Sequence, residues 1–130
     1  MRRRRPEEAG VSSIELVLYM PLLMTAILMT VQFSLVYLGN QAASASAREA
    51  ARVARVTGDA TQGQAKGESL ARDLGRGVLD DVDVQVVQID GDRMRATVSG
   101  RAPGILPFLT PPRVSDSVQG PIEQFVQDAP

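Results

Sequence analysis

Residues 16–47 read LVLYMPLLMTAILMTVQFSLVYLGNQAASASA and contain no charged side chain, although charged residues make up 22% of the 130-residue chain. As a helix, residues 16–38 would extend about 34 Å at a rise of 1.5 Å per residue. The hydrocarbon core of a bilayer is about 30 Å thick. A helix that is apolar on every face could be buried in a soluble protein only by more chain than remains here. We therefore predict a single-pass transmembrane helix over about 14–38, with the lipid bilayer as its surroundings.

The charges on either side of this stretch predict its orientation. Four consecutive arginines precede it, Arg2, Arg3, Arg4 and Arg5. Basic residues favour the cytoplasmic side of a membrane segment, and the arginines at 48, 52 and 55 offset this bias only in part. The N-terminus is therefore expected in the cytoplasm and the C-terminal part outside it. The absence of Cys fits export.

Composition excludes several classes of function. The net charge is −1, and the chain lacks the basic surplus of a nucleic-acid-binding protein. Without His or Cys it lacks the commonest general base, the usual zinc ligands and any thiol nucleophile. The aspartates between 80 and 92 lack the spacing of a calcium loop, and no glycine-rich phosphate loop is present. We predict no catalytic residue, no metal and no cofactor, and therefore no enzyme.

Glu15 opens the apolar stretch, and an acidic residue in a membrane segment needs a partner or a task. Gly10 stands just before a five-residue stretch that ends in Glu15, behind a basic leader. This arrangement resembles the prepilin peptidase site of type IV pilins. The resemblance implies cleavage between Gly10 and Val11 by a prepilin peptidase, with leader 1–10 left in the cytoplasm. The new α-amino group, with a reference pKa of about 7.7 to 8.0, could pair with Glu15 of the same or an adjoining subunit.

Further motifs follow at fixed distances from Glu15. Pro21 comes six residues later, then Leu22-Leu23, Gln32-Phe33 and an Ala-rich segment over 44–54. This succession resembles the TadE-like family of pseudopilins from Flp/Tad pilus systems. The resemblance implies a minor pilin or pseudopilin that partners other pilin subunits and the Tad assembly machinery. It also implies a cell-membrane protein that is incorporated in an extracellular pilus used for adhesion or secretion.

The apolar helix should continue beyond the bilayer, because residues 40–56 contain neither Pro nor Gly. Gly58 should end it, which gives one long helix over 11–57. Pro21 predicts a kink between Val17 and Pro21. One ridge of small side chains would let a neighbouring subunit's helix approach closely. It comprises Ala43, Ala47, Ala50, Ala51 and Ala54. The alternative for this ridge is a solvated, Ala-rich helix.

Residues 58–130 are expected to form a small extracytoplasmic α+β module. Leucines and a valine at helical spacing predict a short helix over about 64–76. Alternating valines over 82–86, an Asp-Gly-Asp turn and a second alternating run over 94–98 predict a β-hairpin. A third strand is expected over about 113–119. The predicted fold class is α+β, a long pilin-like helix followed by a short helix and a three-stranded antiparallel sheet whose small core leans on the long helix.

Two other processing routes stay open on the sequence. Small residues over 43–47 resemble a signal peptidase site, which would release a secreted binding module near Ala45 or Ala47. The apolar run, however, is about twice as long as the usual 7 to 15 residues of a signal peptide. Alternatively, the chain keeps its leader as an uncleaved membrane-anchored scaffold of a secretion machine, because Leu16 stands where Flp-type substrates have an aromatic residue.

Overall fold

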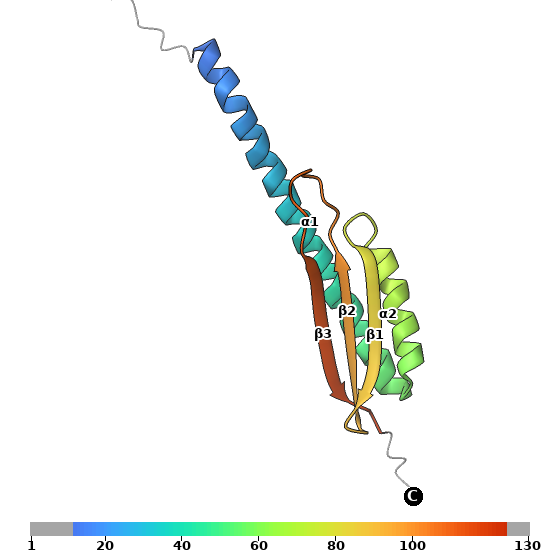
Figure 1. Cartoon of the computed structure of the whole chain (residues 1–130). Coiled ribbons are helices and arrows are strands. Elements are labelled where there is room, and N and C mark those ends of the chain that lie inside the picture. The colour runs from blue at the N-terminus through green and yellow to red at the C-terminus, as the bar shows by residue number, and fades with distance from the viewer. Residues whose placement is uncertain (1–11, 125–130) are drawn as a thin grey trace, which may run out of the picture.

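One long helix, α1 (Ser13–Thr57), carries the rest of the fold along its C-terminal half (Figure 1). The computed structural model describes residues 12–124. After α1 come helix α2 (Ala60–Leu74) and strands β1 (Asp80–Ile89), β2 (Arg93–Arg101) and β3 (Arg113–Pro121). The strands form one antiparallel sheet in the order β1-β2-β3. The predicted α+β class, with a long helix, a short helix and a three-stranded sheet, is confirmed.

Helix α1 is continuous over its 45 residues, which correspond to about 68 Å. Pro21 lies inside it, two turns beyond the helix start, without ending it. As a proline it has no N–H to donate to the carbonyl of Val17. Polar side chains of the apolar segment bond the carbonyls one turn back, as Thr25 Oγ1 does to Pro21 O at 2.8 Å. The helix ends at Gly58, whose left-handed φ of 68° is most favourable for a residue without Cβ. The end expected at Gly58 is confirmed.

Helix α2 begins earlier than we predicted, at Ala60 rather than about 64, and it ends at Leu74 rather than 76. Asp59 caps its N-terminus, because the Asp59 Oδ1 accepts a hydrogen bond from the Thr61 backbone N–H at 2.8 Å. This hydrogen bond to the charged form lowers the pKa of the Asp59 carboxyl. Only Gly58 and Asp59 separate the two helices, so α2 turns back at once along α1.

Two glycines of α2 lie against the alanine ridge of α1. A Cβ added to Gly63 would lie 2.6 Å from Ala54 Cβ and 2.7 Å from the Ala50 carbonyl oxygen. A Cβ added to Gly67 would lie 2.8 Å from Ala50 Cβ. The helices therefore approach more closely than any pair of larger side chains would allow. The glycines that weaken the helical propensity of α2 are the residues that let it pack.

The sheet covers the remaining side of α1 with one apolar face. Its β1–β2 turn uses Asp90 and Gly91 at φ 53° and 77°, as the Asp-Gly motif predicted. The buried side chains of the sheet are Val84, Val86, Met94, Ala96, Val98 and Val114. The opposite face is mostly polar and exposed, as in the cross-strand row of Gln85, Thr97 and Ser117. This alternation is that of an antiparallel sheet with one face toward a core.

The core consists of small residues of α1 packed against the sheet and α2. Both apolar clusters include α1 alanines, so the prediction that the module leans on the long helix is confirmed. The alanine ridge was predicted to pack against a neighbouring subunit, but in the structure it packs against elements of its own chain. The five residues of the ridge are at most 1% exposed, because α2 and the sheet of the same chain cover them: Ala43, Ala47, Ala50, Ala51 and Ala54. A neighbouring subunit cannot reach this ridge while the module is folded.

The end of β3 is tied to the last turn of α1. The Arg55 Nε donates to the Pro121 carbonyl oxygen at 2.8 Å, and the Glu123 backbone N–H donates to the Arg55 carbonyl oxygen at 3.0 Å. The Arg55 guanidinium also pairs with Glu123 at 3.6 Å. These contacts close the module at the end farthest from the apolar helix (Figure 1).

Candidate assembly and membrane surface

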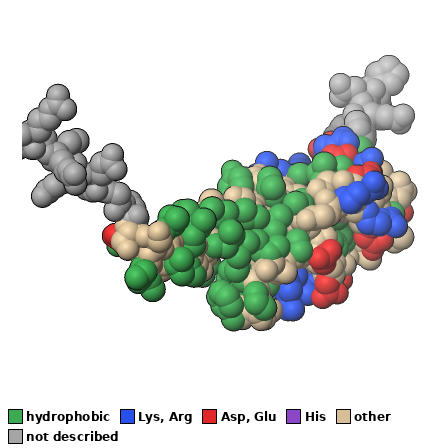
Figure 2. Space-filling model, turned by 90° about the horizontal axis from the view of Figure 1, so that it is seen from above, with side chains coloured by type: hydrophobic (Ala, Val, Ile, Leu, Met, Phe, Trp, Pro, Cys, Tyr) green, Lys and Arg blue, Asp and Glu red, His purple; other side chains and the backbone are tan. Residues whose placement is uncertain are grey.

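The N-terminal half of α1 is an uncovered apolar surface. Every described residue from Ser12 to Ile27 is exposed. Helix α1 contains an 18-residue window apolar enough to cross a membrane, and none of that window is buried within the chain. Figure 2 shows apolar side chains covering the part of the molecule toward the start of α1, with charged side chains gathered toward the other end. An apolar surface of this extent needs lipid or protein around it.

Glu15 lies in the first turn of α1 and is exposed. The N-terminal end of a helix dipole favours a negative side chain at this position. Within residues 12–124, no ion pair involves Glu15. The predicted partner, the new amine at Val11, lies outside the described residues, as do Gly10 and the arginines Arg2, Arg3, Arg4 and Arg5. The carboxylate thus stands where a neighbouring chain could reach it.

Protein covers α1 only from Leu28 onward. Leu28, Gln32 and Val36 lie on one face of the helix and are buried or half-buried, whereas Phe33 and Tyr37 on other faces are exposed. Farther along this face, a Cβ added to Gly39 would lie 2.7 Å from the Val78 carbonyl oxygen. The module therefore begins within the predicted membrane span of 14–38 rather than beyond it.

Gln32 attaches the module to α1 within the predicted membrane span. It is 2% exposed, and its amide forms two hydrogen bonds with the loop between β2 and β3. The Gln32 Nε2 donates to the Pro103 carbonyl oxygen at 3.1 Å, and the Ile105 backbone N–H donates to Gln32 Oε1 at 2.9 Å. In the sequence, Gln32 stands out only as part of a family resemblance. A buried amide in an apolar stretch needs partners, and that requirement is the feature that could have revealed it.

Replacing Gln32 by leucine is expected to detach this loop from α1. The substitution leaves the part-buried Pro103 carbonyl and Ile105 N–H without their partner, which costs at most about 1–3 kcal/mol for each group, the penalty of a fully buried one. Hydrogen exchange of the Ile105 amide, measured on the full chain in detergent micelles, should become faster in Gln32→Leu. Thr30→Leu is the matched control, because Thr30 is exposed and its hydroxyl bonds only the Ala26 carbonyl of its own helix. Equal exchange in Gln32→Leu and the parent would contradict the role assigned to Gln32.

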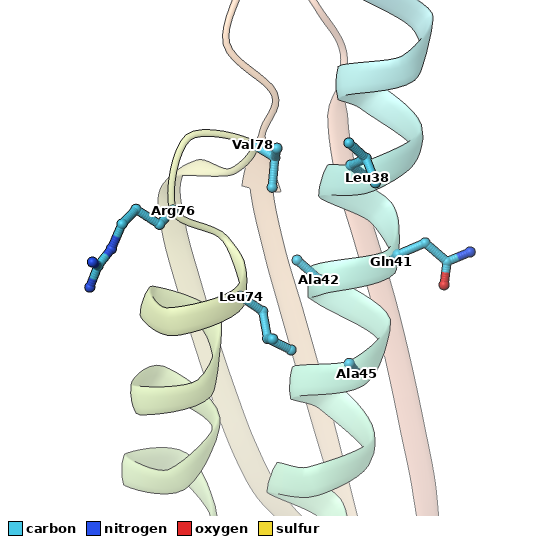
Figure 3. Close-up of a pocket in the computed structure, with 7 residues that line it drawn as sticks. All are labelled: Leu38, Gln41, Ala42, Ala45, Leu74, Arg76 and Val78. Atoms are coloured by element: carbon cyan, nitrogen blue, oxygen red, sulfur yellow. The ribbon is translucent and has the colours of Figure 1, made fainter.

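A shallow apolar groove of about 430 Å³ lies between α1 and the C-terminal end of α2 (Figure 3). Leu38 and Ala42 of α1 face it, and Leu74 points across from α2 toward α1. Gln41 and Arg76 point outward at its two rims (Figure 3). A second groove of about 490 Å³ lies along α1 itself, beside Phe33 and Tyr37. Both are open hollows in an apolar surface.

The charged residues of the module form structural pairs. The Glu49 carboxylate accepts two hydrogen bonds from Arg52, at 2.8 and 2.9 Å, and this contact lowers the pKa of Glu49. Arg113 pairs with Asp81 at 2.9 Å. Within residues 12–124, no group of three or more His, Cys, Asp or Glu could hold a metal ion.

The segment that contains this apolar surface is similar to a known protein family. A family model described as TadE-like protein matches residues 10–52. Over these residues, about a third of the chain, the sequence is similar to TadE-like proteins. The match includes Glu15, Pro21 and Gln32 and ends before α2 and the sheet. Neither the curated proteins nor the solved structures gave a match.

The segment similar to TadE-like proteins and the uncovered apolar part of α1 coincide in the sequence. The match begins at Gly10 and contains the whole uncovered apolar surface of α1. Together they fit a pilus-associated protein of a Tad system with a single membrane-spanning helix. The TadE-like family is a structural rather than an enzymatic one, and residues 53–130 lie outside the match.

Proposed function

We propose that this protein is a minor pilin or pseudopilin, a structural subunit of a Flp/Tad-type pilus. In this proposal a prepilin peptidase cuts after Gly10, and α1 holds the subunit in the membrane until assembly. The observation that carries it is the uncovered apolar window of α1, joined without interruption to a folded module and lying within a TadE-like match. Such a window would be a liability in a soluble protein, but it is what a helix needs first in lipid and then in a bundle.

Pairing of the Glu15 carboxylate would favour the transfer of a subunit from the lipid bilayer into the helix bundle of the pilus. After cleavage, the Val11 amine of one subunit would neutralise the Glu15 carboxylate of a neighbour. Each charge alone is costly to bury, and pairing offsets much of that cost. Leader 1–10 and its arginines would keep the N-terminus in the cytoplasm, while the module lies on the other side.

Subunits would contact one another through the exposed part of α1. The alanine ridge is occupied by α2 and the sheet, so the exposed apolar side chains within residues 14–38 are the part of α1 left for a neighbouring subunit. Exposed Phe33 and Tyr37 line one groove on this surface, and Leu38 lines both grooves. Large apolar side chains next to shallow grooves suit the packing of one helix against another.

Release by a signal peptidase is disfavoured on physical grounds. A cut near Ala45 or Ala47 would remove Ala42 and Ala43, which belong to the core cluster with Leu79 and Val98. It would also remove Gln32, which holds the β2–β3 loop. The released module would lose part of its core and be destabilised by several kcal/mol. An uncleaved anchor keeps these contacts and is the second candidate.

Fractionation of cells tests the proposal. We expect the protein in sheared pili, at a low ratio to the major pilin, and we expect it to be missing from that fraction in cells without prepilin peptidase. Membranes of the same cells provide the comparison. Recovery in membranes alone would favour the uncleaved anchor, and recovery as a soluble protein in the medium of unpiliated cells would favour the secreted module. Either result would overturn the proposed function.

A further inference from the structure

We propose that the loop between β2 and β3, residues 102–112, rests in the headgroup region of the bilayer beside α1. The loop would then set the depth at which the helix is held. This inference rests on the proposed membrane anchoring by α1 and adds a second, non-helical contact with lipid. Its partner is the lipid surface itself.

The composition of the loop is that of a membrane-contacting segment. Residues 102–112 read APGILPFLTPP and contain no charge, whereas Arg101 and Arg113 bracket them and face each other in the β2–β3 register. A turn closed by the Leu109 N–H and the Leu106 carbonyl at 3.3 Å forms the loop's middle. Leu106 is buried, but Phe108 is 70% exposed, and Ile105 and Leu109 are each 39% exposed. The turn thus uses one apolar side chain for the fold and presents three others outward.

The position of the loop along α1 is fixed by Gln32. Its two hydrogen bonds hold Pro103 and Ile105 at the level of that residue. Figure 1 shows the loop reaching beyond the ends of the strands and alongside α1, toward the apolar end of the helix. The loop is therefore the part of the module closest to the exposed helix surface that would lie in lipid.

The length of α1 before Gln32 matches a bilayer. From Ser13 to Gln32 the helix rises about 28 Å at 1.5 Å per residue, and a hydrocarbon core is about 30 Å thick. Lipid-exposed irregular backbone does not occur within the hydrocarbon. If the span extended to residue 38, the loop backbone would be drawn about 9 Å into it. The membrane span is therefore placed at about residues 13–31, with the loop at its outer boundary.

Continuity with the anchor favours lipid as the occupant of this surface. Exposed Ile27 and Val31 precede Gln32 on α1, so the helix and the loop tip form adjoining apolar areas. The apolar side chain of Phe108 suits shallow burial at the boundary between headgroups and acyl chains, as Phe and Leu do on the apolar face of interfacial segments. Arginines at both ends of the loop suit lipid phosphates, although Arg113 also pairs with Asp81.

Site-directed spin labelling tests the depth of the loop directly, because the chain has no natural Cys. Three single-cysteine variants of the full chain carry the label in phosphatidylethanolamine–phosphatidylglycerol proteoliposomes. Phe108→Cys reports on the loop, Leu23→Cys on α1, and Gln85→Cys on the exposed polar face of the sheet. The measured quantity is collision with oxygen, which concentrates in lipid, relative to collision with a water-soluble nickel chelate.

The proposal expects a several-fold higher oxygen-to-nickel ratio at 108 than at 85, and a still higher ratio at 23. A ratio at 108 equal to that at 85, with 23 in lipid, would overturn the loop contact but leave the membrane anchor intact. Water-like ratios at both 23 and 108 would overturn the proposed anchoring as well. Protection at 108 that disappears when the protein is diluted in lipid would show that a second copy covers the loop, and would also overturn the proposal.

Discussion

Glu15→Ala is expected to reduce the recovery of this protein in sheared pili at least tenfold, while its amount in membranes stays the same. The alanine removes the charge proposed to neutralise the Val11 amine of an adjoining subunit, so an unpaired amine would enter the helix bundle. A tenfold loss corresponds to about 1.4 kcal/mol, less than the usual cost of breaking a buried ion pair. Insertion should not suffer, since alanine is more favourable in a membrane than glutamate.

Two further variants separate charge from shape in this prediction. Glu15→Gln keeps the size of the side chain but not its charge, so it should fail in assembly as Glu15→Ala does. Thr25→Ala removes an exposed hydroxyl that bonds only the Pro21 carbonyl in the same helix, and it should assemble normally. The measurement is quantitative immunoblotting of sheared pili and membranes from the same cells. Equal recovery of Glu15→Ala and the parent in pili would contradict the pairing.

Gly63→Val is expected to destabilise the module by about 1–3 kcal/mol, the usual cost of overpacking a well-packed contact. The added Cβ would stand 2.6 Å from Ala54 Cβ and 2.7 Å from the Ala50 carbonyl oxygen, and neither atom belongs to a flexible side chain. Helix α2 would have to move off α1 and expose part of the core. In an exposed helix the same glycine would normally be the less stable choice.

The control for Gly63 is Ala65→Val on the exposed side of the same helix. It introduces the same β-branched side chain, so its cost is limited to a few tenths of a kcal/mol of helix propensity. Denaturant unfolding of the full chain in detergent micelles, followed by circular dichroism, compares the two. A Gly63→Val protein as stable as the parent would show that the close α1–α2 contact contributes nothing to the fold.

Periodicity and composition predicted most of the secondary structure of this fold. The absence of Pro and Gly between residues 40 and 56 predicted that α1 would continue past the apolar segment, and it ends at Gly58 as expected. Alternating valines and an Asp-Gly turn predicted the β1–β2 hairpin. These features are local, so they can be read without knowing what packs against them.

The errors arose where the tertiary partner decides the outcome. A ridge of alanines indicates that something approaches closely, but the sequence could not distinguish a neighbouring subunit from α2 of the same chain. Gly63 and Gly67 lower the helical propensity of α2, yet they permit its contact with Ala50 and Ala54. Gln32 was missed for the same reason, because its partners at 103 and 105 are distant in the sequence.

Other sequence predictions remain predictions. Cleavage between Gly10 and Val11 and the orienting role of Arg2–Arg5 concern residues outside the described part of the chain. Helix α1 runs through Pro21 without a break. The expected kink between Val17 and Pro21 would be tested by measuring the orientations of backbone N–H bonds before and after Pro21 in a membrane. The pairing of Glu15 likewise depends on a terminus that only processing creates.

The most direct test of this account is the N-terminal residue of the protein recovered from cells, determined by mass spectrometry of the intact chain and of its first peptide. Processing as a pilin-like subunit predicts Val11 as the first residue. A chain that still begins with Met1 and its leader, or one that begins near Ser46 or Arg48, would contradict it.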